Sequence, residues 1–124
     1  LFLLGTLLNY FFPGLETSGL QLFIWGFVLS TVLLFHVTVS INSIAHIWGS
    51  QRYKTTDNSR NNALLALLTF GEGWHNNHHY YPNTVKQGFF WWELDITYWV
   101  IKAMSLVGLT WDLKQIPAHV KKLP

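Results

Sequence analysis

Three of the chain's six histidines, His75, His78 and His79, fall within five consecutive positions. Six histidines scattered at random over 124 residues would produce the pattern HxxHH only about 0.01 times. Imidazole binds iron, copper, zinc and nickel, and the chain has no cysteine thiolate to compete for the metal. The run therefore predicts a metal site, although a patch of titrating surface histidines or a structural zinc site would use the same residues.

A second pair of metal-binding residue types precedes this run by about thirty positions. Asn42 and His46 are four residues apart near the end of an apolar segment, so on a helix they would share one face. This spacing is also common among capping or interfacial residues. His46 can meet the later histidines if the intervening segment folds back. Four histidines and an asparagine exceed what one closed tetrahedral zinc site needs, which favours two metals.

The composition is that of a membrane protein rather than a soluble domain. Half of the residues are hydrophobic and 11% are charged, against roughly 25% in soluble domains. Residues 20–41 carry no charge unless His36 is protonated, and as a helix they would be about 33 Å long. We expect this segment to cross a bilayer, and His36 to be either a buried polar residue in it or a residue that supports the metal ligands. A buried helix of a soluble core is the alternative.

The start of the chain predicts a partner helix for this segment. Residues 1–12 are apolar, and the polar turn at 13–19, with Pro13 and Gly14, separates them from the long segment. The chain begins with leucine and lacks a basic leader, so we expect a C-terminal fragment that opens within a helix. Basic residues soon after the long segment place the region from residue 49 onward on the cytoplasmic side, and these residues are Arg52, Lys54 and Arg60.

The remaining residues predict short helices at the membrane surface. Asp57, Asn58 or Ser59 could cap a helix that runs through residues 62–68 and ends before Gly71 and Gly73. The histidine run would then form a turn or a short irregular helix. An amphipathic interfacial helix is expected over residues 89–109 and a short basic helix over 114–122. The net charge of +2 is scattered, which argues against nucleic acid as a partner.

Several motifs together resemble one enzyme family. The sequence NSIAHIWG at residues 42–49, DNSRNN at 57–62, GEGWHNNHHYYP at 71–82 and WWELDITYWVIK at 91–102 resemble the C-terminal part of membrane fatty acyl desaturases of the delta-9, stearoyl-CoA desaturase type. The resemblance covers essentially the whole chain. The combination of NxxxH with GEGWHNNHH is far more specific than either motif alone.

This resemblance implies a chemistry and a set of ligands. In that family, histidine boxes hold two irons that activate O₂ and remove hydrogens from a methylene pair of an acyl chain, leaving a cis double bond. The metal residues implied here are Asn42, through a bound water, and His46, His75, His78 and His79. The family's earlier HxxxxH and HxxHH boxes have no counterpart in these residues. The two iron ions would thus be completed by ligands absent from this chain, which alone is expected to be inactive.

The resemblance also suggests residues that support the site. Candidates for orienting the imidazoles are Glu72, Asn76, Asn77 and Asp95, with simple solvation as the alternative for Asp95. Four basic residues could meet the phosphates of a CoA headgroup or simply the membrane surface, namely Arg52, Lys54, Arg60 and Lys86.

The resulting prediction is an all-α integral membrane protein. Residues 1–124 would be a single C-terminal fragment of a desaturase domain, with a transmembrane hairpin at 1–48 and a cytoplasmic histidine-box and interfacial region at 49–124. As part of a longer chain it would be a fatty acyl-CoA desaturase of a bacterial inner membrane. Its partners would be O₂, a fatty acyl-CoA or acyl-lipid substrate, and an electron donor such as ferredoxin or cytochrome b5. A membrane di-iron hydroxylase or ketolase, and a non-catalytic metal-binding module, stay open.

Overall fold

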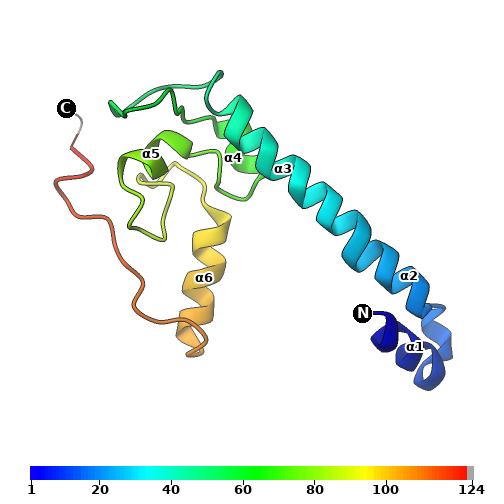
Figure 1. Ribbon diagram of the computed structural model, residues 1–124. Helices are drawn as coiled ribbons and strands as arrows, with labels where there is room; N and C mark the ends of the chain where they lie inside the picture. The colour runs from blue at the N-terminus through cyan, green and yellow to red at the C-terminus, as the bar shows by residue number, and fades with distance from the viewer. Residues whose placement is uncertain (123–124) are drawn as a thin grey trace. The chain divides into compact units, whose positions relative to one another are not determined.

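The computed structural model describes residues 1–122, which fold into helices joined by turns and irregular segments (Figure 1). Within these residues there are no strands, only isolated β-bridges that pair Asn61 with Ser50 and with Trp74. The all-α prediction is confirmed. The chain divides into two compact units, Leu1–Val39 and a unit that begins at Ser40, and each is described separately below.

The first unit is a helical hairpin held by close backbone contact. Helix α1 (Phe2–Phe11) leads through a 3₁₀ turn, η1 (Pro13–Leu15), into α2 (Gly19–Phe23), whose first turn is capped by Ser18 accepting from the Gln21 N–H at 3.1 Å. A Cβ added to Gly19 would lie 2.6 Å from the Phe2 carbonyl oxygen. Only glycine therefore permits α1 and α2 to approach this closely.

Helix α2 continues without a break into a long apolar helix. The π-helical segment η2 (Ile24–Leu29) and α3 (Ser30–Ile44) extend it, so that Gly19–Ile44 forms one run of 26 residues with a mean hydropathy of 2.1. In residues 1–122 this is the one helix long and apolar enough to cross a membrane. The predicted span at 20–41 lies inside it. His36, expected to be either buried or in support of the metal ligands, is exposed on this helix.

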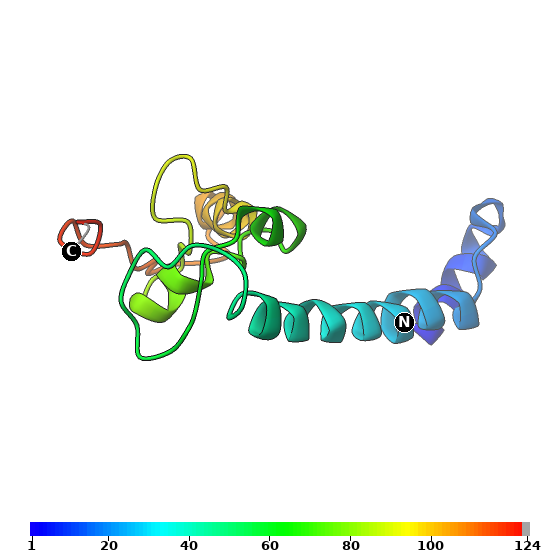
Figure 2. The same ribbon diagram turned by 90° about the horizontal axis from the view of Figure 1, so that it is seen from above.

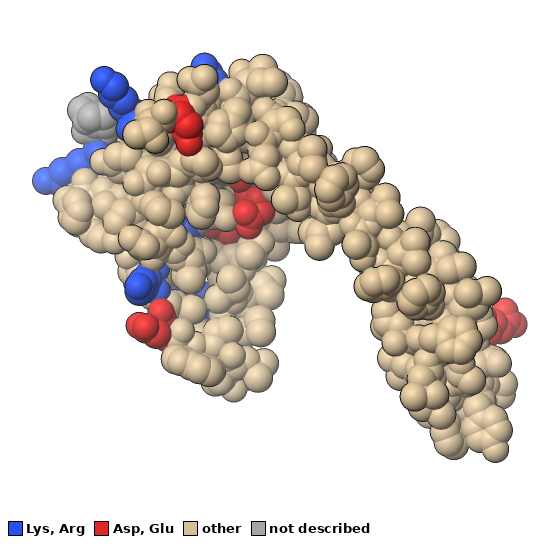
Figure 3. All heavy atoms as spheres, in the orientation of Figure 1, with Lys and Arg blue, Asp and Glu red and all other residues tan. Residues whose placement is uncertain are grey.

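Charge is nearly absent from the first unit. Glu16, in the hairpin turn, is its one Asp, Glu, Lys or Arg residue. Figure 3 accordingly shows an almost unbroken uncharged surface over the hairpin, with the acidic and basic side chains gathered elsewhere. Such a surface suits contact with lipid rather than with water.

The second unit begins with the end of α3 and a long loop that leads to α4 (Ala63–Leu68). The loop folds back on itself, since the Arg60 N–H donates to the Ala45 carbonyl at 2.7 Å. The cap of α4 is Asn62, whose side chain accepts from the Leu65 N–H at 2.9 Å. The predicted caps Asp57, Asn58 and Ser59 were therefore wrong, because Asp57 instead closes a turn within the loop by accepting from the Ser59 N–H.

The predicted interfacial helix is shorter than expected. Helix α6 spans Ile96–Leu106, whereas residues 89–95 form turns. Asp95 explains this boundary, because its buried carboxylate caps α6 at the Tyr98 N–H and also accepts from the N–H groups of Gln87 and Gly88. A carboxylate bonded to the backbone in this way favours a helix start over a helix interior.

The predicted terminal helix over residues 114–122 was also wrong. This segment, orange to red in Figure 1, forms irregular chain and turns. Pro117 would interrupt a helix in this segment. The side chain of Val120, which is 3% exposed, packs into the hydrophobic core. The core cluster contains Tyr53, Phe89 and Val120, with Ile116 and others packed around it.

Candidate metal centre

A short helix carries the histidine run. Helix α5 spans His75–Tyr80, as the predicted short helix required, and the i, i+3, i+4 spacing places His75, His78 and His79 on one side of it. His75 is buried, His78 is half-buried and His79 is exposed. The three imidazole rings lie close together, with centroids of His75 and His79 at 4.2 Å and of His78 and His79 at 5.8 Å.

His46 lies beside the histidine run, as it would if the intervening segment folded back. Its Nε2 lies 3.1 Å from Nε2 of His75, and one ligand atom each from His46, His75 and His79 falls within 4.8 Å of the others. Two nitrogens bound at right angles to one metal, with bonds of about 2.1 Å, would be about 3.0 Å apart. The spacing of His46 and His75 therefore fits two neighbouring ligands of a single ion.

The other two predicted metal residues are His78 and Asn42. His78 is next to the group of three, with its ring centroid 6.4 Å from that of His75. Asn42 is exposed on the last turn of α3, whereas His46 lies in the turn that follows the end of α3 at Ile44. The helix on which Asn42 and His46 were expected to share one face thus ends two residues before His46.

The environment of His75 and His78 favours their uncharged form. Burial, followed by the neighbouring His79, His46 and His78, lowers the pKa of His75 to about 4. The pKa of His78 is lowered mainly by burial as well. Neutral imidazole is the form that binds a transition metal, so the donor set fits iron.

The asparagines between the histidines do not orient imidazoles as predicted. They point to the other side of α5 and are fully buried. Asn76 accepts from the N–H groups of Arg52 and Tyr53 at 2.9 and 2.8 Å and donates to the Tyr53 carbonyl at 2.9 Å. The loop between α3 and α4 consequently lies alongside α5 (Figure 2).

Asn77 ties α5 to two further segments. Its Oδ1 accepts from Asn61 Nδ2 at 2.7 Å, and its Nδ2 donates to Glu93 at 2.8 Å. Glu93 is buried and forms an ion pair with Arg52, whose guanidinium also lies 4.6 Å from the centre of the Phe90 ring. Because the Arg52 guanidinium is already paired with Glu93 and packed on Phe90, the structure argues against its binding a CoA phosphate.

The carboxylates predicted to support the histidines have other partners. Glu72 accepts from Gln87 Nε2 at 2.7 Å, and Asp95 caps α6 rather than being solvated. A carboxylate that hydrogen-bonds a histidine is Asp57, which pairs with Nδ1 of His79. The sequence contained a signal for this residue, since Thr55, Asp57 and Ser59 have the spacing of a side-chain-closed turn.

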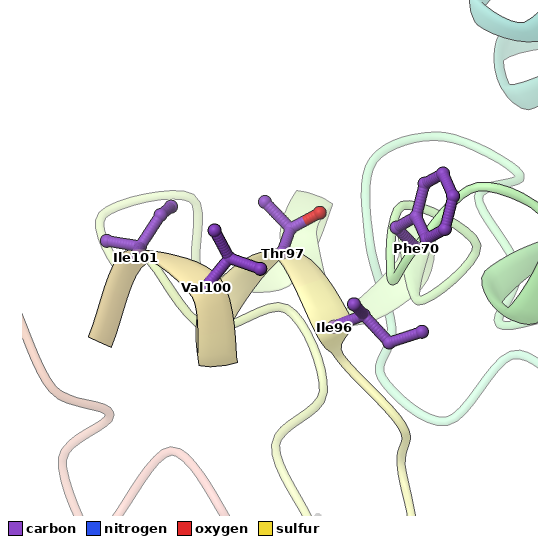
Figure 4. A pocket seen from close by; sticks show the side chains of 5 residues that line it. All are labelled: Phe70, Ile96, Thr97, Val100 and Ile101. Atoms are coloured by element: carbon purple, nitrogen blue, oxygen red, sulfur yellow. The ribbon is translucent and has the colours of Figure 1, made fainter. Parts of the chain in front are cut away.

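An apolar groove lies along one side of α6. Figure 4 shows its lining side chains, of which Phe70 comes from the turn after α4 and the others, Ile96, Thr97, Val100 and Ile101, come from one side of α6. The groove has a volume of about 330 Å³. A lining of this kind suits a hydrocarbon surface better than a polar ligand.

The match to a family model decides the family. The model for fatty acid desaturases matches residues 1–111. The chain belongs to the fatty acid desaturase family. The predicted family is therefore confirmed.

Individual relatives agree with this assignment. The chain is 41% identical over 110 residues to Delta-9 acyl-lipid desaturase 1 of Arabidopsis thaliana, covering 89% of this chain and 34% of that protein. It is 40% identical over 105 residues to an acyl-CoA C20 Delta5-desaturase of Anemone leveillei, covering 85% and 33%. It is 44% identical over 92 residues to an sn-2 palmitoyl-lipid 9-desaturase of Nostoc sp. (strain 36), covering 74% and 32%. The chain spans about a third of the length of these relatives.

Proposed function

We propose that this chain supplies one wall of the di-iron centre of an O₂-dependent membrane fatty acyl desaturase. His46, His75, His78 and His79 would bind iron, and Asn42 would hold a water on the metal. Further ligands, absent from this chain, would complete the two-iron site. When bound, iron would supply the O₂ activation that removes hydrogens from an unactivated methylene pair.

The observation that carries this proposal is the convergence of His46 with His75 and His79. These residues are about thirty positions apart, yet their ligand atoms lie within 4.8 Å of one another. Burial keeps His75 neutral, and a neutral imidazole is ready to bind a metal without first losing a proton. A merely solvated histidine patch would have no reason to bury a member of the cluster.

The remaining assignments follow from the family and the apolar helix. The substrate would be a fatty acyl chain carried on CoA or on a lipid, since relatives of both kinds are similar to this chain. The helix Gly19–Ile44 would cross the membrane, residues 1–48 forming a hairpin and 49–124 a cytoplasmic region of a bacterial inner-membrane protein. Electrons would come from a donor such as ferredoxin or cytochrome b5.

The test uses the complete protein encoded by the gene, expressed in a host that lacks its own desaturase. Iron per chain is measured on the purified protein, and membrane lipids are analysed by gas chromatography. His78→Ala and His75→Ala are compared with His119→Ala, because His119 is exposed near the terminus. We expect two irons and an unsaturated product for the wild type and for His119→Ala, with both lost in the other two variants.

Other outcomes contradict specific parts of the proposal. Hydroxylated or oxidised product in place of an alkene would indicate a hydroxylase or ketolase. Iron without any change in the lipids would indicate a non-catalytic metal-binding module. Wild-type iron content in His75→Ala would remove the metal assignment itself. Supplying isotope-labelled acyl-CoA or labelled phospholipid to isolated membranes then separates the two classes of acyl carrier.

A further inference from the structure

We infer that Asp57 is a positioning residue that holds the ring of His79 in its metal-binding orientation. The inference rests on the proposed function, in which His79 binds iron. Asp57 Oδ2 pairs with Nδ1 of His79, across 22 positions of sequence. Because Nδ1 is engaged by the carboxylate, Nε2 is the nitrogen left to face a metal.

The Asp57 carboxylate is itself held in place. Its other oxygen, Oδ1, accepts from the Thr55 hydroxyl at 3.0 Å and from the Ser59 N–H at 2.9 Å. The hydroxyls of Thr55 and Ser59 lie 3.1 Å apart, and Ser59 is fully buried. One oxygen of Asp57 thus fixes the turn while the other is directed at His79.

The turn is also tied to the helix that carries His79. Asn76, on α5, donates to Ser59 Oγ at 3.5 Å as well as bonding the backbone of Tyr53. The positions of Asp57 and His79 are consequently set by the same framework. Their pairing does not depend on two long side chains meeting at a mobile surface.

His79 needs such a partner more than His75 does. The His75 side chain is enclosed, so packing restricts its ring, whereas about a third of the His79 side chain is exposed. A carboxylate that accepts from Nδ1–H fixes the tautomer and orientation of an imidazole and makes Nε2 a stronger ligand. For His79, the hydrogen bond to Asp57 therefore fixes the ring orientation that packing leaves free.

The experiment compares three variants in the complete protein. Asp57→Asn keeps an oxygen for the turn but removes the charge and offers an amide to His79. Thr55→Val removes a hydrogen bond of the turn and leaves the oxygen that faces His79. Asp112→Asn is a matched control, since Asp112 is exposed. Iron affinity is measured by competition with a chelator, the Co²⁺-loaded protein is followed by visible absorption, and the iron-free protein is melted.

We expect Asp57→Asn to change iron affinity and Thr55→Val to change the melting temperature of the iron-free protein. Asp57→Asn should weaken iron binding by about 10–100-fold and change the Co²⁺ spectrum, with an unchanged melting temperature of the iron-free protein. Thr55→Val should lower that melting temperature and leave iron affinity within about threefold. Asp112→Asn should match the wild type.

Two different results would contradict the positioning role of Asp57, and they can be distinguished. Wild-type affinity and Co²⁺ spectrum in Asp57→Asn would refute the role of Asp57 while leaving the iron site intact. A wild-type protein that takes up neither iron nor Co²⁺ would instead refute the proposed function, and the inference with it.

Discussion

The side chain of Asn76 bonds the backbone of Tyr53 as a neighbouring strand would, accepting from its N–H at 2.8 Å and donating to its carbonyl at 2.9 Å. Both residues are fully buried. A single amide therefore fixes the register between the histidine helix α5 and the loop that precedes α4.

Replacing Asn76 should destabilise the protein strongly. In Asn76→Ala, the N–H groups of Arg52 and Tyr53 and a carbonyl would lose their partner inside the protein, at a cost of about 2–3 kcal/mol in the free energy of unfolding. Thermal unfolding of the complete protein in detergent measures this. Asn58→Ala, at an exposed position, is the control and should melt as the wild type does. Equal melting of the two variants would contradict the anchoring role.

The ion pair of Arg52 and Glu93 should show strong coupling. The Glu93 side chain is fully enclosed and that of Arg52 is 20% exposed, so Glu93→Gln leaves a poorly solvated cation and should cost about 3 kcal/mol. Combining it with Arg52→Met removes that cation, so the double variant should lose less than the two single losses added. A double-mutant cycle on unfolding free energies measures the difference, expected at about 1–3 kcal/mol. Additive losses would refute the coupling, and Glu16→Gln, in the exposed hairpin turn, should change nothing.

The hairpin of the first unit should depend on Gly19 and not on Gly14. A Cβ at Gly19 would meet the Phe2 carbonyl oxygen at 2.6 Å, whereas a Cβ at Gly14 would meet nothing within 4 Å. Gly19→Ala should separate α1 from α2 and cost about 1–3 kcal/mol. The two variants can be compared by protease susceptibility of the hairpin in detergent and by melting. The idea fails if Gly14→Ala is as damaging as Gly19→Ala.

Membrane insertion of the helix Gly19–Ile44 should depend on the depth of an introduced charge. Leu33 lies near its middle and Leu20 near its start. Leu33→Lys should disfavour insertion by about 2.5–3.5 kcal/mol, while Leu20→Lys should cost far less because lysine near a helix end reaches the interface. Insertion can be measured by glycosylation of engineered sites on either flank. Equal effects of the two lysines would argue that this helix does not cross the bilayer.

The sequence revealed the parts of this protein that depend on local pattern. The apolar run at 20–41 predicted a long helix, which lies inside Gly19–Ile44, and the histidine run was expected to form a turn or a short irregular helix, which is α5. Both predictions depend on hydrophobicity and on turn residues that are neighbours in the sequence.

The misjudged residues depend on contacts between distant segments. Asn76, Asn77 and Asp95 are buried polar residues, and their partners come from loops whose conformation no periodicity encodes. Asp57, Asn58 or Ser59 was expected to cap a helix because these residue types favour the N-cap position, yet the actual cap, Asn62, is three to five positions later. At these residues, hydrogen bonds to distant segments determine the structure more than local sequence preference does.

The five letters HNNHH contain two sets of side chains that face opposite ways from one short helix. His75 and His79 lie beside His46, whereas the asparagines bond the loops at Tyr53 and Asn61. A screen that scores only the double bond in the product would report the same failure for a change on either side. Alanine scanning of this motif would therefore overstate the number of ligands, and iron content must be read beside melting temperature to distinguish a lost donor from a collapsed support.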